Sequence, residues 1–262
     1  MGTDDPYFLD GRTAIVTGGF GLIGKAVSSA LAARSARVTI LDSSADRWPG
    51  IESEFRAAAL DVAFRQADVS ELETIPDFVE DCDTSVGGAD VWVNCAYPRT
   101  DDWGDGPETA GAANWSANVN LQMTSTCLVS SEIAKHMASR QGGSIINIAS
   151  IYGVVAPDFA VYDGTDMTTP PAYSAIKGGI IAYSRYLASY WGAKGVRVNT
   201  VCPGGVFADQ PKSFVDAYCR RTPLGRMATP QDIAGPVAFL ASDAAGYMTG
   251  ATLMVDGGWT AL

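Results

Sequence analysis

TGGFGLIG, Thr17 to Gly24, decides the fold of this chain, because it joins an apolar strand-like run to a helix-like segment. A turn this rich in glycine lets the backbone approach a pyrophosphate, and the N–H groups that open the following helix point at the phosphate charge. Asp42 ends the next apolar run, 18 residues beyond Gly24. A dinucleotide fold places the acid that binds the adenosine ribose near this position. The turn and the acid together predict a dinucleotide site.

Composition narrows the class of protein. The chain has 262 residues, of which 47% are hydrophobic and 18% charged, as expected for one large globular domain. The net charge of −11 and the pI near 4.4 repel phosphate backbones, so nucleic acid is not expected as a partner.

The five cysteines have no CxxC spacing, which argues against a disulfide framework and against a metal site. No run approaches the roughly 20 apolar residues that span a bilayer, and the start of the chain lacks the features of a secretion signal. We therefore expect a cytoplasmic protein without a membrane partner.

Strand-like and helix-length segments alternate along the whole chain. The expected strands are Thr13–Thr17, Arg37–Leu41, Ala63–Ala67, Val91–Cys95, Ser144–Ala149, Val196–Val201 and Thr252–Val255. This alternation predicts an α/β protein: a single Rossmann-fold domain over residues 1–262, with a doubly wound, seven-stranded parallel sheet and helices on both faces. The long irregular stretches, residues 96–110, 151–171 and 203–211, follow the carboxyl ends of strands, where such sheets bind ligands.

A family resemblance rests on the glycine-rich turn together with YSAIK, Tyr173 to Lys177. The chain resembles the short-chain dehydrogenase/reductases over essentially its full length. The motifs that carry the resemblance, in the order of the family, are TGGFGLIG, Asp42, Asp68-Val69, VNCA (Val93–Ala96), Asn120, Ser150, Tyr173 with Lys177, Pro203-Gly204-Gly205 and VDGG (Val255–Gly258).

The catalytic prediction centres on Tyr173. Residues four apart share one face of a helix, so we expect the Lys177 ammonium beside the Tyr173 phenol, where it would lower the phenol pKa. The resemblance implies that Tyr173 exchanges a proton with an alcohol or carbonyl oxygen and that Lys177 also holds the nicotinamide ribose. It further implies that Ser150 hydrogen-bonds the reacting oxygen and that Asn120 holds a water that links Lys177 to solvent.

Asp42 favours NAD(H) over NADP(H), because a 2′-phosphate would meet its carboxylate at close range. Ser43 and Ser44 after it are uncharged. The turn and the resemblance together give the expected cofactor-binding residues: Gly18, Phe20, Gly21, Leu22, Ile23, Gly24, Asp42, Asp68, Val69, Asn94, Ala96, Tyr173, Lys177, Pro203, Gly204 and Val206.

Two features mark the expected substrate side. Residues 156–171 form an insertion relative to the family, which is either a wall of the substrate site or a surface loop used in packing or oligomer contacts. NCAYPR, Asn94 to Arg99, replaces the family's NNAG and puts Arg99 at the mouth of the site. Arg99 is then an anion clamp for the substrate, or it is a solvated arginine or one of a structural ion pair. Tyr152 and Tyr162 are further substrate candidates.

The substrate itself stays open. These segments are similar to oxidoreductases associated with bacterial surface-sugar and flagellin-glycan pathways, such as legionaminic acid synthesis, which favours a polar sugar, sugar phosphate or nucleotide-linked sugar. One alternative is a 3-oxoacyl-[acyl-carrier-protein] reductase, which needs a basic docking patch; Arg140, Arg220, Arg221 and Arg226 are the candidates for it. Another is an NAD-binding sensor without turnover. The resemblance also implies a homotetramer or homodimer.

Overall fold

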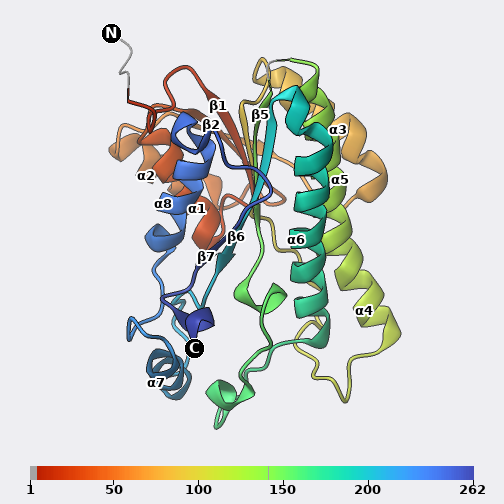
Figure 1. The fold of residues 1–262 in the computed structure, drawn as a ribbon, viewed down its shortest axis with the longest axis vertical. Coiled ribbons are helices and arrows are strands. Elements are labelled where there is room, and N and C mark those ends of the chain that lie inside the picture. Colours follow the sequence, from red (N-terminus) through yellow and green to blue (C-terminus); the bar gives the residue numbers. More distant parts are fainter. Residues whose placement is uncertain (1–4, 141) are drawn as a thin grey trace.

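A seven-stranded, all-parallel sheet forms the centre of the computed structural model, which describes residues 5–140 and 142–262 (Figure 1). Its strand order is β3-β2-β1-β4-β5-β6-β7. The strands are β1 Thr13–Thr17, β2 Arg37–Asp42, β3 Val62–Gln66, β4 Val91–Asn94, β5 Gly143–Ile148, β6 Val196–Pro203 and β7 Thr252–Val255. Every expected apolar run overlaps one of them, so the predicted sheet is confirmed.

Helices cover both faces of this sheet (Figure 1). They are α1 Leu22–Ala32, α2 Trp48–Ala57, α3 Ile75–Ser85, α4 Ala112–Asn118, α5 Ser125–Ala138, α6 Pro171–Trp191, α7 Lys212–Arg221 and α8 Pro230–Ala241. A π-helical segment, η2 Val119–Thr124, joins α4 to α5. Short 3-10 turns are η1 Leu72–Thr74, η3 Ile151–Gly153, η4 Phe159–Tyr162, η5 Gly192–Lys194, η6 Asp243–Ala245 and η7 Trp259–Ala261.

The alternation of side chains along β1 explains the two layers. Val16 belongs to the buried cluster that α1 and α8 form on one face. Ile15, its neighbour in sequence, belongs to the cluster of α3, α5 and α6 on the other face. Since successive side chains of a strand point to opposite faces, and all five residues of β1 are buried, this strand must lie in the middle of a sheet covered on both sides.

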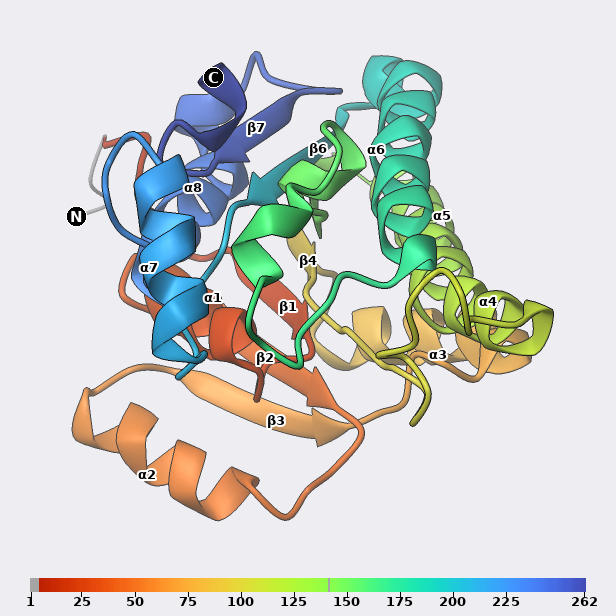
Figure 2. The ribbon, with the colours of Figure 1, turned by 90° about the horizontal axis from the view of Figure 1, so that it is seen from below.

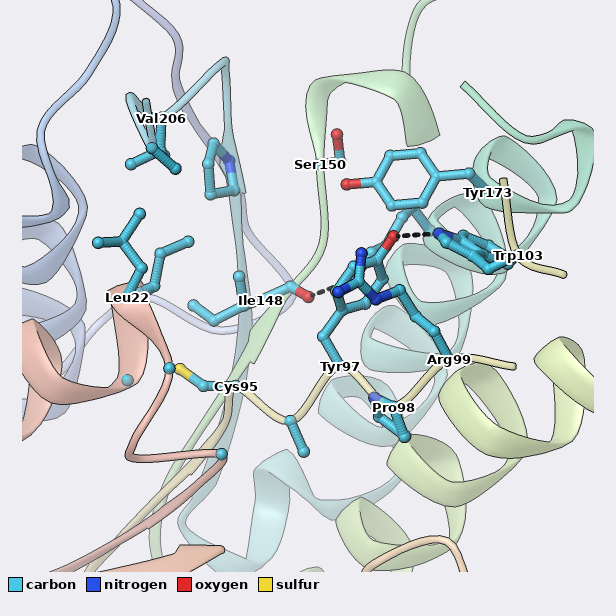
Figure 3. A pocket seen from close by; sticks show the side chains of 18 of the residues that line it. Leu22, Cys95, Tyr97, Pro98, Arg99, Trp103, Ile148, Ser150, Tyr173 and Val206 are labelled. Carbon is cyan, nitrogen blue, oxygen red and sulfur yellow. Dashed lines mark hydrogen bonds between the residues drawn. The ribbon is translucent and has the colours of Figure 1, made fainter. Parts of the chain in front are cut away.

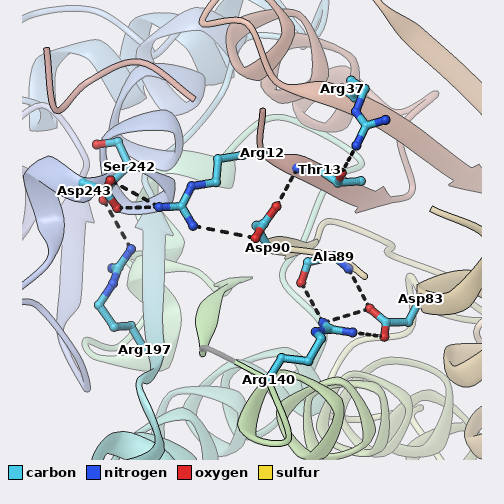
Figure 4. Close-up of polar contacts among 10 residues, drawn as sticks. All are labelled: Arg12, Thr13, Arg37, Asp83, Ala89, Asp90, Arg140, Arg197, Ser242 and Asp243. Atoms are coloured by element: carbon cyan, nitrogen blue, oxygen red, sulfur yellow. Dashed lines mark hydrogen bonds and ion pairs between the residues drawn. The ribbon is translucent and has the colours of Figure 1, made fainter. Parts of the chain in front are cut away.

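Ion pairs gather at the amino ends of the strands (Figure 4). Arg12, just before β1, pairs with Asp243 at 3.2 Å and with Asp90 at 3.6 Å. Asp90 in turn accepts the Thr13 N–H at 2.8 Å. These contacts join the ends of β1 and α8 to the turn before β4.

The loops at the carboxyl ends of the strands gather at the opposite edge of the sheet (Figure 2). They are the glycine turn after β1, residues 95–111 after β4, residues 149–170 after β5 and residues 204–211 after β6. The inserted residues 156–171 form η4 and an irregular return to α6.

Candidate active site

A cavity of about 1010 Å³ opens among these loops. It runs from the glycine turn, past the ends of β2 and β4, to Ser150, Tyr173 and the inserted segment (Figure 3). Among residues 5–140 and 142–262, no three His, Cys, Asp or Glu side chains are grouped to hold a metal ion. Within the same part of the chain, no helix has the length and apolarity to cross a membrane.

The glycine turn forms the floor at one end of the cavity. Gly18 has φ +65°, and a Cβ there would lie 2.6 Å from the Ala96 Cα. A Cβ on Gly24 would collide with the Gly18 carbonyl oxygen. The following helix α1 begins at Leu22 without a side-chain cap or an acid in its first turn, so its opening N–H groups are available to an anion. This cradle fits the pyrophosphate of a dinucleotide.

Asp42 lies at the end of β2 and lines the cavity. Its Oδ2 accepts the Phe20 N–H at 3.1 Å. The Phe20 side chain is 2% exposed and packs against Trp48 and Phe64 beneath α2. Phe20 was expected to bind the cofactor, but its side chain does not line the cavity. Its backbone N–H holds Asp42, while its ring packs with Ile40, Ile51 and Phe55 in a buried cluster beneath α2.

Most other expected cofactor residues line the cavity, namely Gly21, Leu22, Ile23, Asp68, Val69, Ala96, Pro203, Gly204 and Val206. Asn94 does not. It is 6% exposed, and its amide group donates to Asn147 Oδ1 at 2.8 Å and accepts from Trp92 Nε1 at 3.0 Å. Asn94 thus belongs to a buried hydrogen-bond network rather than to the cavity lining, because its side chain bonds to Asn147 on the neighbouring strand β5 and to Ser130 on α5.

Ser150, Tyr173 and Lys177 come together at the other end of the cavity. Ser150 follows β5, and its hydroxyl lies beside the Tyr173 hydroxyl (Figure 3). Tyr173 and Lys177 stand one turn apart on α6, with the Lys177 Nζ 5.7 Å from the centre of the Tyr173 ring. Lys177 is 6% exposed and donates to the Ile148 carbonyl oxygen at 3.2 Å.

Burial dominates the electrostatics of this pair. It raises the pKa of Tyr173 above the usual value, and the hydrogen bond with Ser150 opposes it. In the protein alone, desolvation of the phenolate therefore outweighs the favourable contacts. The expected lowering of the phenol pKa by Lys177 stays a prediction. Burial also lowers the pKa of Lys177, to about 8.

Asn120 lies outside the cavity. Its side chain is exposed on η2 and its Oδ1 accepts the Thr124 hydroxyl at 3.2 Å. A wider π-helical turn changes which residues face the sheet, and here Gln122 takes the buried position. Gln122 is 2% exposed, and its amide makes no hydrogen bond within the described residues. The structure thus corrects the expected placement of Asn120 at the site.

Aromatic side chains form the wall beside Tyr173 (Figure 3), and of these the sequence indicated Tyr152 as a substrate candidate but not Trp103. The rings of Tyr97, Trp103 and Tyr152 meet the Tyr173 ring edge-on, with centroids 6.1, 6.2 and 6.5 Å away. Trp103 Nε1 donates to the Tyr97 hydroxyl at 3.0 Å. A signal for Trp103 exists in the sequence, since it is a lone aromatic residue in the polar segment TDDWGDG.

The inserted segment contributes directly to the cavity. Tyr162 and residues 166–170 line it. The Tyr162 and Thr169 hydroxyls are hydrogen-bonded at 2.5 Å, and Tyr162 donates to the Tyr152 hydroxyl at 3.5 Å. Arg99 also lines the cavity, with its guanidinium carbon 5.2 Å from the centre of the Tyr97 ring.

Comparison with known proteins agrees with this geometry. The sequence family described as Enoyl-(Acyl carrier protein) reductase, a branch of the short-chain dehydrogenases, matches residues 21–260. The chain belongs to the short-chain dehydrogenase/reductase family. The chain is 33% identical to D-threitol dehydrogenase of Mycolicibacterium smegmatis, with 99% of this chain and 97% of that protein covered. It is 32% identical to 2-dehydro-3-deoxy-D-gluconate 5-dehydrogenase of Pseudoalteromonas atlantica (97% and 98%) and 30% identical to post-translational flagellin modification protein A of Campylobacter coli (96% and 99%).

Solved structures share the fold over nearly the whole chain. Gluconate 5-dehydrogenase of Burkholderia cenocepacia, in complex with NADP and tartrate, has a TM-score of 0.87, 27% identity and 98% coverage of each chain. A short-chain dehydrogenase of Leptospira borgpetersenii with bound NAD⁺ has a TM-score of 0.83, 31% identity and coverage of 99% and 97%. This short-chain dehydrogenase is therefore an oxidoreductase that uses a nicotinamide dinucleotide to interconvert an alcohol and a carbonyl, and the sensor alternative is not retained.

Proposed function

We propose that this short-chain dehydrogenase oxidises an alcohol of a small polyhydroxylated compound, a sugar, a sugar alcohol or a sugar acid, and reduces the corresponding carbonyl. The observation that carries the proposal is the meeting of Ser150, Tyr173 and Lys177 at one end of a cavity whose other end is the glycine turn. Hydroxyl groups of Tyr152, Tyr162 and Thr169 line the same end, as suits a substrate with several hydroxyls. The relatives named for D-threitol and for a deoxygluconate support this class.

Tyr173 carries the proton transfer in this proposal. In the oxidation direction the phenolate accepts the hydroxyl proton of the substrate, while the Ser150 hydroxyl hydrogen-bonds the same oxygen and orients it. When bound, an oxidised nicotinamide would supply the hydride acceptor and a positive charge near the phenol. Lys177, fixed by the Ile148 carbonyl oxygen, adds its own charge beside the phenolate that forms.

NAD(H) is the proposed cofactor. Asp42 lines the cavity with one carboxylate oxygen held by the Phe20 N–H, and its other oxygen can accept from the ribose hydroxyls. Arg47 lines the same end of the cavity, and the sequence motifs gave it no role. Its guanidinium offers a charge to a 2′-phosphate, but the Asp42 carboxylate repels that group at closer range.

A thioester of an acyl carrier protein is the less favoured substrate. A relative of 31% identity is named 3-oxoacyl-[acyl-carrier-protein] reductase, from Chlamydia pneumoniae. Docking of an acidic carrier needs free basic side chains. Three of the four candidate arginines, however, pair with carboxylates of this chain: Arg140 with Asp83, Arg221 with Asp158 and Arg226 with Asp232.

A homo-oligomer is also proposed, with the outer face of α5 and α6 as its contact surface. Leu128, Tyr186 and Tyr190 are 38%, 59% and 63% exposed there, and the two tyrosine rings stack. Apolar surface of this kind favours a two-fold interface. Light scattering on the purified protein should give a dimer or tetramer mass, and Tyr186→Lys should lower it. A cytoplasmic location fits the free thiols of Cys82 and Cys202.

The substrate class is tested by initial rates with NAD⁺ and NADP⁺ against D-threitol, D-gluconate, a nucleotide sugar and, in the reverse direction, acetoacetyl thioester. We expect turnover of a polyol or sugar compound with NAD⁺. Reduction of the thioester alone would contradict the proposal and favour the acyl-carrier alternative.

A further inference from the structure

Arg99 differs from most arginines of the chain, because its guanidinium has no hydrogen-bond or ion-pair partner within the described residues. Ten of the other twelve donate to a carboxylate, a hydroxyl or a carbonyl oxygen of the chain. Within the described residues, Arg99 makes neither a hydrogen bond nor an ion pair, and it lines the large cavity. Of the two alternatives left open by the sequence, the ion-pair role therefore has no support in residues 5–140 and 142–262. A solvated arginine remains the alternative that the experiment below must separate from an anion site, since Arg99 is exposed.

The guanidinium has a defined place. It lies over the Tyr97 ring, 5.2 Å from its centre, and that ring is held by the hydrogen bond from Trp103. The same ring meets Tyr173 edge-on at 6.1 Å (Figure 3). The Tyr97 ring thus contacts both the Arg99 guanidinium and the Tyr173 ring. Both groups line one cavity, so one small substrate can contact Arg99 and Tyr173 together.

The charges around the cavity sharpen the assignment. Asp42 and Asp68, two of its carboxylates, lie at the cofactor end, and the third, Asp166, forms no ion pair with Arg99 within the described residues. The chain as a whole has a net charge of −11 and repels anions at long range. An anionic substrate therefore needs a local cation, and a guanidinium offers paired donors that match a carboxylate or a phosphate.

We propose that Arg99 binds an anionic group, a carboxylate or a phosphate, of the substrate whose reacting alcohol faces Tyr173. This inference rests on the proposed function, because it names the chemistry of the same substrate more narrowly. Arg99 thereby distinguishes acidic from neutral polyols, while Tyr173 and Ser150 act on either.

The test compares three matched probes: D-glucitol, D-gluconate and D-glucitol 6-phosphate. The variants are Arg99→Gln, which removes the charge, and Arg99→Lys, which keeps the charge without the paired donors. Arg220→Gln is the control, since Arg220 is exposed on α7 and does not line the cavity. Steady-state rates give kcat/KM for each probe, and calorimetry on the NADH-loaded protein gives the affinity for each anion without turnover.

We compare kcat/KM for the better anionic probe with kcat/KM for glucitol. Arg99→Gln should lower this ratio about 10- to 100-fold, because KM for the anion rises. The calorimetric affinity for the anion should fall by the same factor. Arg99→Lys should recover part of the loss, and the control should match the wild type. Preference for gluconate identifies a carboxylate, and preference for the phosphate identifies a phosphoryl group.

An unchanged ratio in Arg99→Gln would overturn the inference while leaving the proposed function intact. Anion binding that is absent from the wild type, or that is equal in wild type and Arg99→Gln, would overturn it as well. Anion binding that depends on Arg99 without turnover of any probe would instead contradict the proposed function and support the anion site.

Discussion

Replacement of Asp42 by Asn should reverse the preference between the two nicotinamide dinucleotides. The substitution removes the charge but keeps an oxygen that can accept the Phe20 N–H, a contact of 3.1 Å in the structure. A neutral amide loses the charge-assisted hydrogen bonds to the adenosine ribose, which are worth about 1.5–3 kcal/mol. The affinity for NAD⁺ should therefore fall about 10- to 150-fold.

The same change removes a repulsion that acts on NADP⁺. A carboxylate and a 2′-phosphate charge about 4 Å apart repel by about 4 kcal/mol at an effective dielectric constant near 20. Asp42 is only half-buried, so solvent screens this repulsion, and about 1–3 kcal/mol is a realistic gain. The affinity for NADP⁺ should rise about 5- to 150-fold, with Arg47 as the group that pairs with the phosphate.

The assay is the dissociation constant of each cofactor, measured by calorimetry, with kcat/KM as the second readout. Adding Arg47→Gln to the Asp42→Asn variant should lower the NADP⁺ affinity again, because it removes the cation that pairs with the 2′-phosphate, but it should leave the NAD⁺ affinity of the single variant unchanged. A ratio of the two affinities that Asp42→Asn leaves unchanged would refute the assignment of Asp42 to the ribose.

Three further predictions concern single residues. Gly24→Ala should lower the free energy of unfolding by about 1–3 kcal/mol and weaken cofactor binding, because its Cβ meets the Gly18 carbonyl oxygen. Gly50→Ala, with open space around its Cβ, is the matched control. Equal denaturation midpoints for the Gly24→Ala and Gly50→Ala variants would contradict the prediction. The cofactor-free protein should become more stable as the pH rises from about 8, where burial has placed the Lys177 pKa, toward the lysine value near 10.5, because the unfolded chain binds the extra proton in this window. Lys177→Met should remove this rise in stability and increase the free energy of unfolding by about 3 kcal/mol at neutral pH. Equal pH profiles of denaturation for the two proteins would contradict the assignment of this rise to Lys177. Asn120→Ala should retain most of kcat, because Asn120 is exposed outside the cavity. A loss of more than about 100-fold in kcat, a magnitude typical of a proton-transfer residue, would contradict the conclusion that Asn120 takes no part in catalysis.

The sequence was sufficient for the fold because its signals are periodic and repeated. Strand runs such as Val91–Val93 are apolar throughout and buried, as is typical of central parallel strands, and the glycine turn and Asp42 follow their strands directly. Helix geometry puts Tyr173 and Lys177 on one face, so their adjacency was predictable, whereas their catalytic role came from the family resemblance.

The remaining parts of the site depend on tertiary structure. The motif could not show that the Phe20 ring turns into the core or that Asn94 joins a buried network with Asn147. Asn120 was misplaced because a π-helical turn breaks the α-helical period on which face assignments depend. The raised pKa of Tyr173 reflects burial by loops far apart in sequence, and no local pattern encodes that desolvation.

The central claim is that Tyr173 exchanges the substrate proton in a cavity that binds a nicotinamide dinucleotide. The most direct measurement is the rate of reduced nicotinamide formation by wild type, Tyr173→Phe and the control Tyr247→Phe, whose tyrosine is fully exposed, with NAD⁺ affinity measured in parallel. We predict that Tyr173→Phe binds NAD⁺ yet loses at least about 100-fold in kcat, while the control keeps the wild-type rate. A Tyr173→Phe variant that turns over at the wild-type rate would contradict the account.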